Sequence, residues 1–352
     1  MLAIEQQTIV SPAEKLVGIT LLDNWHVQER IRHNDGLSGS TRSTCYRAKS
    51  TKGEYAFVKA FDFPAAAVDT DTLEKMVREY NYERDVHYFC SDSNIKRVTR
   101  IYGANRITID GSLVHFIICE WENKCLREHQ PLGQTDIPPS ERFKALRDIA
   151  SALSQLHKAG IAHQDVKPSN AVCSDLGLVK LTDLGSSSCL SLKEPPHDSD
   201  CLVGQPSYAP YELLYEAPPN EWESRRFGCD LFLLGNLCFT SFTGVSLSYI
   251  AVHWTPEYLK HINYTGSYSE VLPHLLEAHE VIIPLFLKET CNLPDKILKE
   301  LTELISCLCH PDPSRRGHTK SLQHNNQYSL ERIVSKLDYL ATGSKVLLRA
   351  TK

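Results

Sequence analysis

The segment "HQDVKPSN" at residues 163–170 brings together residue types that suit phosphate, metal and proton chemistry. Asp165 has a reference pKa of about 3.9, so we expect an ionised carboxylate that can orient a hydroxyl group and accept its proton. Lys167 can neutralise charge on a phosphoryl group, and the neutral carbonyl oxygen of Asn170 suits a hard cation such as Mg²⁺. A polar surface loop is the alternative interpretation, and this segment alone leaves both open.

A second acidic residue follows in "LGLVKLTDLGSSS", residues 176–188. The apolar alternation predicts a strand that ends just before Asp183, which is followed by Leu184 and Gly185. A hairpin between Asn170 and Asp183 would bring these two oxygen ligands to the same place, where they are predicted to hold one metal ion. An ordinary Asp-x-Gly turn is the alternative.

The elements that position these residues are predicted to change in type along the chain. Up to about residue 121 the pattern favours strands, with one hairpin over residues 43–62 and a second over residues 106–121 around an Asp-Gly turn. A helix is predicted over residues 71–89 because this stretch has no Gly or Pro and its apolar residues recur at helical spacing. Its expected inner residues are Leu73, Val77, Tyr80 and Val86.

Helices are predicted to dominate after about residue 123. Residues 140–160 have apolar side chains at helical spacing and end at Gly160, a helix stop signal. Residues 229–244 are apolar on almost every side, which predicts a buried helix. The expected inner residues of the first helix are Phe143, Leu146, Ile149, Ala150, Leu153 and Leu156. The pattern predicts an α+β fold with a small sheet lobe, a larger helical lobe and a ligand site between them.

Composition and charge exclude several classes of protein. The 352 residues are 42% hydrophobic and 23% charged, which is enough to bury a substantial core. A net charge of −5 disfavours a general nucleic-acid binder. No stretch approaches the ~20 apolar residues of a spanning helix, and the N-terminal residues carry no basic leader. We therefore expect no membrane association and a reducing, cytoplasmic location for the twelve cysteines, which form no C-x-x-C pair.

The motif "HQDVKPSN" followed by "DLG" resembles the catalytic loop and metal-binding triplet of eukaryotic-type Ser/Thr protein kinases. Further motifs of that family occur in its order: "EYAFVKAFD", "ICEWEN", "GQPSYAPYELL", "CDLFLLG" and "HPDPSRRG". The resemblance implies a bilobal kinase fold with an ATP cleft between a β-rich N-lobe and an α-helical C-lobe. The implied divisions are an N-terminal extension at 1–29, the N-lobe at 30–121, the C-lobe at 122–320, and a C-terminal helix and tail at 321–352.

The resemblance also implies a role for each matched residue. Asp165 and Lys167 would be catalytic, and Asn170 and Asp183 would hold Mg²⁺. The residues that would bind ATP, directly or through an ion pair, are Ser38, Gly39, Ser40, Lys59, Glu83, Glu120 and Glu122. Glu83 best matches the ion-pair partner of Lys59, and Glu79, one turn earlier, competes for that role. Cys119 would be the gatekeeper, and Glu212 with Arg316 would form a structural ion pair.

Several positions depart from the family's pattern. Ser38, Ser40 and Ser43 stand at the three glycine positions of the phosphate-covering loop. Phe57 replaces the usual alanine over adenine, and Gln205 replaces a threonine that often helps to place the substrate hydroxyl. These changes leave open a pseudokinase, a non-catalytic module that binds nucleotide and signals by shape. A small-molecule phosphotransferase is less favoured, since it is expected to lack "YAPYE" and the Arg316 partner.

Gln164 stands where an arginine often precedes the catalytic aspartate, which marks an atypical, non-RD kinase. A neutral side chain there needs no phosphate to balance it, so the predicted enzyme does not require phosphorylation of its activation loop. Lys167 two residues after Asp165 is the pattern of Ser/Thr kinases. We therefore expect transfer of the γ-phosphoryl group of Mg·ATP to Ser or Thr of protein substrates. The loop offers the hydroxyl groups of Ser186, Ser187, Ser188, Ser191 and Ser199.

Overall fold

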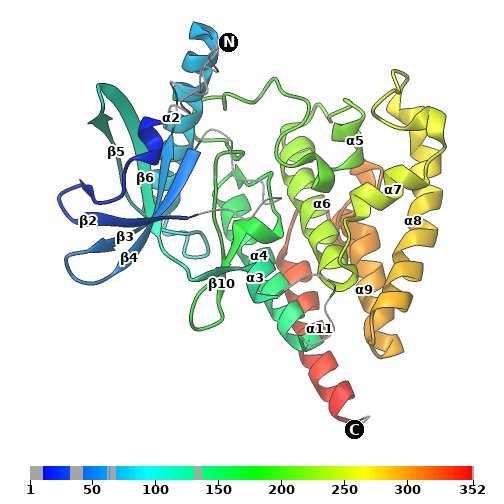
Figure 1. Ribbon diagram of the computed structural model, residues 1–352. Helices are drawn as coiled ribbons and strands as arrows, with labels where there is room; N and C mark the ends of the chain where they lie inside the picture. Colours follow the sequence, from blue (N-terminus) through cyan, green and yellow to red (C-terminus); the bar gives the residue numbers. More distant parts are fainter. Residues whose placement is uncertain are drawn as a thin grey trace, which may run out of the picture. The chain divides into compact units, whose positions relative to one another are not determined.

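The structure is a computed structural model that describes residues 11–31, 43–61, 63, 69–130, 133 and 137–350. The chain divides into two compact units. Unit 1 comprises Met1–Ser91 and Thr99–Glu122, and unit 2 comprises Asp92–Val98 and Asn123–Lys352. A sheet-rich unit followed by a mainly helical one confirms the predicted fold class (Figure 1).

Unit 1 is built on a six-stranded sheet with the order β1-β2-β3-β4-β6-β5. Its strands are β1 Thr20–Leu21, β2 Trp25–Ile31, β3 Ser43–Ser50, β4 Tyr55–Phe61, β5 Ile101–Ile109 and β6 Ser112–Glu120. All neighbouring strands are antiparallel, and both predicted hairpins are present. Asp110 and Gly111 have φ values of 49° and 80°, which are the positive angles that a two-residue hairpin turn requires.

The sheet begins earlier in the chain than the predicted lobe boundary at residue 30, which falls inside β2. A 3₁₀ turn, η1 (Pro12–Glu14), precedes the first strand. Ala13, Leu16 and Leu21 are almost completely buried in the core on one face of the sheet. The short apolar pattern in this segment was too weak to predict a strand, and its burial depends on strands that come later in the chain.

The helix α2 (Thr70–Asp92) packs its buried residues against the other face of the sheet. Alternation along β6 separates the two cores: Phe116 and Ile118 face one, while Ile117 and Cys119 face the other. The buried stripe of α2 is Met76, Tyr80, Tyr82, Glu83, Val86, His87 and Cys90. Tyr80 and Val86 are buried as predicted, but Leu73 is 38% exposed because it lies at the start of the helix, outside this stripe.

Unit 2 is mainly helical. Its helices are α3 Leu126–His129, α4 Pro139–Lys158, α5 Tyr211–Leu214, α6 Trp222–Thr243, α7 Leu247–Trp254, α8 Tyr268–Thr290, α9 Asp295–Leu308, α10 Thr319–Gln323 and α11 Glu331–Ala350. Its short strands are β7 Lys124–Cys125, β8 Ile161–Ala162, β9 Ala171–Cys173, β10 Val179–Leu181 and β11 Ser188–Cys189, with 3₁₀ turns η2 Pro168–Asn170, η3 Pro206–Tyr208, η4 Glu257–Leu259 and η5 Pro313–Arg315. The last helix, α11, packs along α4 and α9, so the C-terminal segment belongs to the body of this unit (Figure 1).

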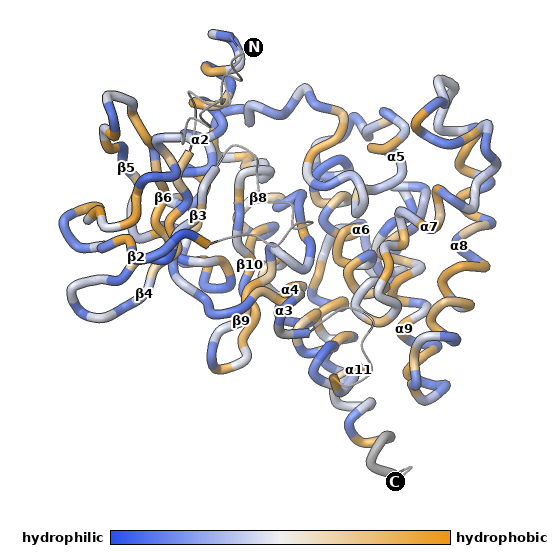
Figure 2. Tube along the Cα trace, viewed as in Figure 1, coloured by the Kyte–Doolittle hydropathy of each residue, from blue (hydrophilic) through white to orange (hydrophobic). Residues whose placement is uncertain are grey.

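The core of unit 2 surrounds α6, which is buried on most sides as its composition predicted. Hydrophobic residues recur turn by turn along α8 and α9 in Figure 2, as in helices with one buried face. A Cβ atom on Gly235 of α6 would lie 2.5 Å from Sγ of Cys309, the residue that follows α9. The helix α6 and the end of α9 therefore approach too closely for a larger residue at position 235. Among the described residues no single helix is long and apolar enough to cross a membrane; only the bent pair α6 and α7 taken together reaches that length and composition.

We expect His279 on α8 to make the fold sensitive to acid. Its side chain is buried, its Nε2 lies 2.6 Å from the Tyr211 hydroxyl, and burial lowers its pKa to about 3. Between this pKa and the ordinary value of about 6.5, the unfolded chain binds a proton that the folded chain rejects. The free energy of unfolding therefore rises with pH in that window, and His279 contributes about 1.4 kcal/mol per pH unit to this rise.

Urea unfolding at several pH values from 4 to 7 measures this slope. The variant His279→Gln is expected to remove it, while His253→Gln, at an exposed position on α7, should keep it. An unchanged slope in His279→Gln would contradict the prediction.

Candidate active site

Unit 1 contains an ion pair between a strand and a helix. Lys59 on β4 donates from Nζ to both carboxylate oxygens of Glu83 on α2, at 2.8 and 3.0 Å. Glu83 is 5% exposed, so its charge needs this partner. The sequence left Glu83 and Glu79 as competitors, and the structure pairs Lys59 with Glu83. The nucleotide-binding role of the pair stays a prediction.

The face of β4 that carries Lys59 also carries Phe57, two residues earlier. The sheet register places Phe57 opposite Cys119 on β6, so an aromatic ring and the predicted gatekeeper are neighbours. At the end of β6, the N–H of Glu120 donates to the carbonyl of Arg100 at 2.8 Å. The N–H of Glu120 is therefore already bonded, and its carbonyl oxygen is the backbone group that remains as a candidate hydrogen-bond acceptor for adenine. The predicted phosphate-covering residues Ser38, Gly39 and Ser40 lie outside the described residues.

In unit 2 a short hairpin returns Asp183 to the neighbourhood of Asn170, as the spacing predicted. The antiparallel strands β9 and β10 pair Ala171 with Leu181. Beyond that pair, the N–H of Thr182 donates to the carbonyl of Asn170 at 2.9 Å. The predicted metal ligands therefore lie at the same end of one hairpin.

Asp165 is the centre of a buried cluster of charges and amides. Its Oδ2 accepts from Nζ of Lys167 at 2.7 Å and from Nδ2 of Asn170 at 2.9 Å, and its Oδ1 accepts from the backbone N–H of Gln205 at 3.2 Å. It is 8% exposed, and burial raises its pKa, opposed by the charge of Lys167. A raised pKa makes the ionised carboxylate a stronger proton acceptor.

A second aspartate holds the backbone of this loop in place. Asp230 on α6 is completely buried, and its oxygens accept from the N–H groups of His163 at 2.8 Å and Gln164 at 2.7 Å. Oδ2 also lies 2.9 Å from Nε2 of His157. His163 in turn lies 3.1 Å from the carbonyl of Thr182. The loop with Asp165 and the hairpin with Asp183 are thus tied to the same core helix.

The backbone is strained at two positions of the cluster. Gln164 has a φ of 60° and Asp183 a φ of 62°, in the left-handed region that residues other than glycine rarely adopt. Such residues cost about 1–3 kcal/mol each and are concentrated at functional sites. Gly204 has a φ of 81°, and a Cβ there would lie 2.5 Å from the Gln164 carbonyl, so this position also requires glycine.

Comparison with known proteins decides the family. The protein kinase domain family matches residues 38–327 of the chain. The chain belongs to the protein kinase domain family. The kinase domain is similar to the Hormonally up-regulated neu tumor-associated kinase homolog B of Xenopus laevis, with 29% identity over 53% of this chain and 29% of that protein. It is also similar to the serine/threonine-protein kinase PTK2/STK2 of Saccharomyces cerevisiae, with 34% identity over 24% of this chain and 11% of that protein. The chain thus spans less than a third of the length of these relatives.

The kinase domain has an ionic network around Gln164 that the sequence did not predict. Nε2 of Gln164 donates to the Ser186 carbonyl and to Oγ of Ser188, both at 2.8 Å, and Oε1 accepts from Arg226 at 3.1 Å. Arg226 on α6 is 2% exposed and forms an ion pair with Asp198. A charged arginine inside an apolar helix, four residues before Asp230, could have indicated a buried ion pair. Nothing in the sequence identified the carboxylate that binds it.

The predicted ion pair between Glu212 and Arg316 is present and fully buried. The guanidinium binds the carboxylate in a bidentate manner, at 2.7 and 2.8 Å. Arg316 also donates to the carbonyls of His310 and Gly228. This pair joins the helix α5, which contains Glu212, to the residue that follows the turn η5.

Proposed function

We propose that this kinase domain is an active serine/threonine kinase that transfers the γ-phosphoryl group of Mg·ATP to hydroxyl groups of protein substrates. The observation that carries this proposal is the buried contact of Asp165 with both Lys167 and Asn170. A scaffold that only binds partners has no need to bury two opposite charges beside a strained backbone. The yeast relative PTK2/STK2 is named a serine/threonine-protein kinase, which supports the same substrate class.

The residues around Asp165 fit a magnesium ion that is bound together with ATP. Nδ2 of Asn170 donates to the carbonyl oxygen and to Oδ2 of Asp165. The side-chain oxygen of Asn170, Oδ1, therefore remains as the candidate ligand for a cation. Among the described residues no group of three His, Cys, Asp or Glu could hold a metal ion unaided. This agrees with Mg²⁺, which proteins bind through one or two side chains plus the phosphates of the substrate. The ion, when bound, would neutralise phosphate charge.

Each residue has a separate task in the proposed reaction. Asp165 orients the substrate hydroxyl and accepts its proton, while Lys167 balances the negative charge that develops on the phosphoryl group. Lys59, oriented by Glu83, holds the α- and β-phosphates. Positioning and electrostatic stabilisation supply most of the rate enhancement in this chemistry.

Incubation of the purified protein with labelled ATP and Mg²⁺ tests the proposal. We expect incorporation of phosphate into the protein itself or into a generic basic protein, and its loss in the variant Asp183→Ala. Asp175→Ala, which changes an exposed aspartate on the β9–β10 turn, is the matched control and should keep activity. No incorporation, together with a rise in melting temperature on adding nucleotide, would instead establish the pseudokinase.

The proposed enzyme does not depend on phosphorylation of its activation loop. Gln164 is neutral and its amide donates and accepts hydrogen bonds, and the buried cation that it contacts, Arg226, is balanced by Asp198 from the loop itself. Arg225 also donates to the carbonyls of Asp198 and Asp200, at 2.8 and 3.0 Å. We expect these contacts to hold the loop in place of a phosphate.

The serine residues of the loop allow a direct test. Ser187 and Ser188 are completely buried, and Ser188 bonds to Gln164, so replacing them would disturb packing. The triple variant of the more accessible Ser186, Ser191 and Ser199 to alanine is expected to keep kcat within about tenfold, or ~1.4 kcal/mol in barrier height. Steady-state turnover of unphosphorylated protein, verified by mass spectrometry, is the measurement. A larger loss in the triple variant would contradict the proposal.

The remaining expectations concern where the enzyme acts. We propose a cytoplasmic enzyme whose partners are protein substrates rather than nucleic acid or membrane. The net charge of −5 supports this, as does the fact that none of the described cysteines forms a disulfide.

A further inference from the structure

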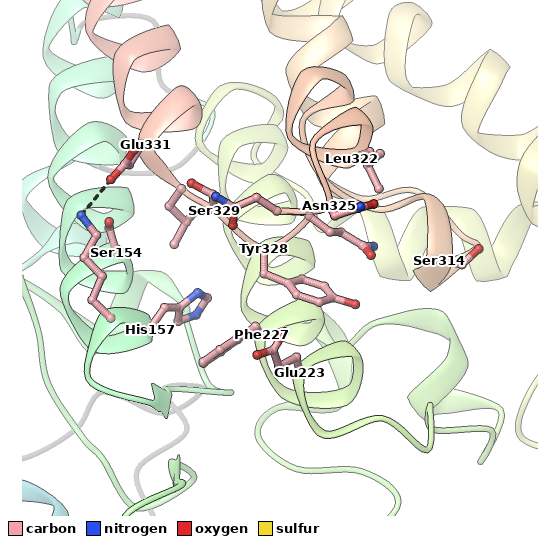
Figure 3. A pocket seen from close by; sticks show the side chains of 14 residues that line it. Ser154, His157, Glu223, Phe227, Ser314, Leu322, Asn325, Tyr328, Ser329 and Glu331 are labelled. Carbon is pink, nitrogen blue, oxygen red and sulfur yellow. Dashed lines mark hydrogen bonds and ion pairs between the residues drawn. The ribbon is translucent and has the colours of Figure 1, made fainter.

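Two adjoining hollows on unit 2 border the segment between α10 and α11. The first has a volume of about 680 Å³ and lies beside α4 and α6 (Figure 3). The second has a volume of about 720 Å³ and lies beside α10 and α11. Asn326, Ser329 and Glu331 line both hollows, which therefore adjoin; the two together are here called the tail groove. Hollows of this volume are in the range that binds ligands.

The end of the tail groove beside α10 and α11 is strongly basic. Its titratable lining residues are His318, Lys320, His324, Glu331, Arg332 and Lys336, together with Tyr339. The single carboxylate, Glu331, forms an ion pair with Lys158 at 2.9 Å, drawn as a dashed line in Figure 3. Lys336 contacts Glu300. In the described part of the chain no carboxylate forms an ion pair with Lys320 or Arg332, although the net charge of the chain is −5.

Arg332 and Lys320 lie close enough to His318 to act on its titration. The pKa of His318 is lowered first by burial and then by the charges of Arg332 and Lys320. Nδ1 of His318 accepts from the N–H of Lys320 at 3.2 Å, so Nε2 carries the hydrogen and can donate to a ligand. An anion bound here would offset the charges of Arg332 and Lys320 and would raise the pKa of His318.

The shape and lining of the groove favour a phosphate group on an extended chain. A phosphate monoester is a dianion at neutral pH with oxygens that accept from several donors at once, which matches two unpaired cations beside the hydroxyl groups of Ser329 and Ser335. The groove continues past this end to the rings of Phe227 and Tyr328 and to the carboxylate of Glu223. An isolated phosphate ion would fill only its basic end, and a flat membrane surface would not enter it.

We infer that the tail groove binds a segment of another protein that carries a phosphorylated serine or threonine. The phosphate contacts Lys320 and Arg332, and neighbouring residues of the segment lie against Phe227 and Tyr328. Glu223 and Glu331 select a basic or hydroxyl-bearing residue beside the phosphate. His157 of the groove contacts Asp230. Lys320 and Arg332, which carry the inference, contact no described residue of the candidate active site, so the inference holds whether or not the domain transfers phosphate.

Fluorescence anisotropy with the full chain and no ATP tests the inference. The probe is a labelled pool of short peptides with a central phosphoserine and randomised flanks, compared with the same pool without phosphate. We expect the phosphorylated pool alone to bind, and the double variant Lys320→Ala, Arg332→Ala to weaken binding by about tenfold or more. Lys345→Ala, which removes an exposed lysine from the same helix as Arg332, is the matched control and should bind as the wild type does.

Two further readouts separate this site from general attraction of charge. Nuclear magnetic resonance titration should show the pKa of His318 rising when the phosphorylated pool is added. Melting temperature and turnover on a generic substrate should be unchanged in the double variant. Equal binding of both pools overturns the inference, as does equal binding by the wild type and the double variant. Vesicles that contain phosphoinositides are a further probe. If they bind the wild type but not the double variant, and the phosphorylated pool does not displace them, the occupant is a membrane and the inference is overturned.

Discussion

Replacing Asp165 by alanine is expected to lower kcat by about 10²–10⁴-fold and to leave Mg·ATP binding largely intact. The carboxylate is the group to which the buried neighbours Lys167 and Asn170 donate, which places it to accept a proton. Nucleotide binding depends on other residues, so the loss should fall on turnover. Steady-state kinetics gives kcat, and a nucleotide titration followed by melting temperature gives the affinity.

The variant Asp165→Ala also leaves Lys167 without its carboxylate partner, so a folding defect must be separated from a catalytic one. Asp165→Asn preserves the size of the side chain and should show the same loss of kcat with a melting temperature near that of the wild type. Turnover of Asp165→Asn within about twofold of wild type would remove this residue from the proposed mechanism.

Replacing Arg316 by methionine is expected to destabilise the protein by about 3–5 kcal/mol, because the buried carboxylate of Glu212 would lose its partner. Glu212 is 2% exposed, so water cannot solvate the charge that remains. The double variant Arg316→Met, Glu212→Leu removes both charges and should recover much of the loss. Urea unfolding followed by fluorescence measures these differences.

Arg315→Met is the matched control for this experiment, since Arg315 is the adjacent residue and is exposed. Its stability should stay within about 0.5 kcal/mol of wild type. A loss in Arg316→Met of less than about 1 kcal/mol would place the pair among weak surface interactions instead.

Local patterns and motif order were sufficient to predict most of what positions the candidate site. The Asp110-Gly111 turn, the hairpin that brings Asp183 to Asn170 and the buried stripe of α4 follow from residues that are near neighbours in the chain. The choice of Glu83 over Glu79 came from the spacing of the family's motifs. Leu73 was misplaced because a helical apolar pattern does not reveal where the packed stripe begins.

The missed features all depend on contacts between distant segments. Asp198 lies in an irregular loop, so its contact with Arg226 could not be read from periodicity. The positive φ angles of Gln164 and Asp183 are imposed by the surrounding structure on residues that do not prefer them. The basic end of the tail groove forms because the chain folds back between α10 and α11, which brings Lys320 and Arg332 to one hollow.

The carboxylate of Asp198 has a consequence for how such an enzyme is switched off. A kinase whose loop is held by a phosphate is silenced when a phosphatase hydrolyses that phosphate, within the lifetime of the protein. Here the anion opposite Arg226 is part of the polypeptide, and hydrolysis cannot remove it. The proposed activity would therefore follow the amount of protein in the cell, which synthesis and degradation determine.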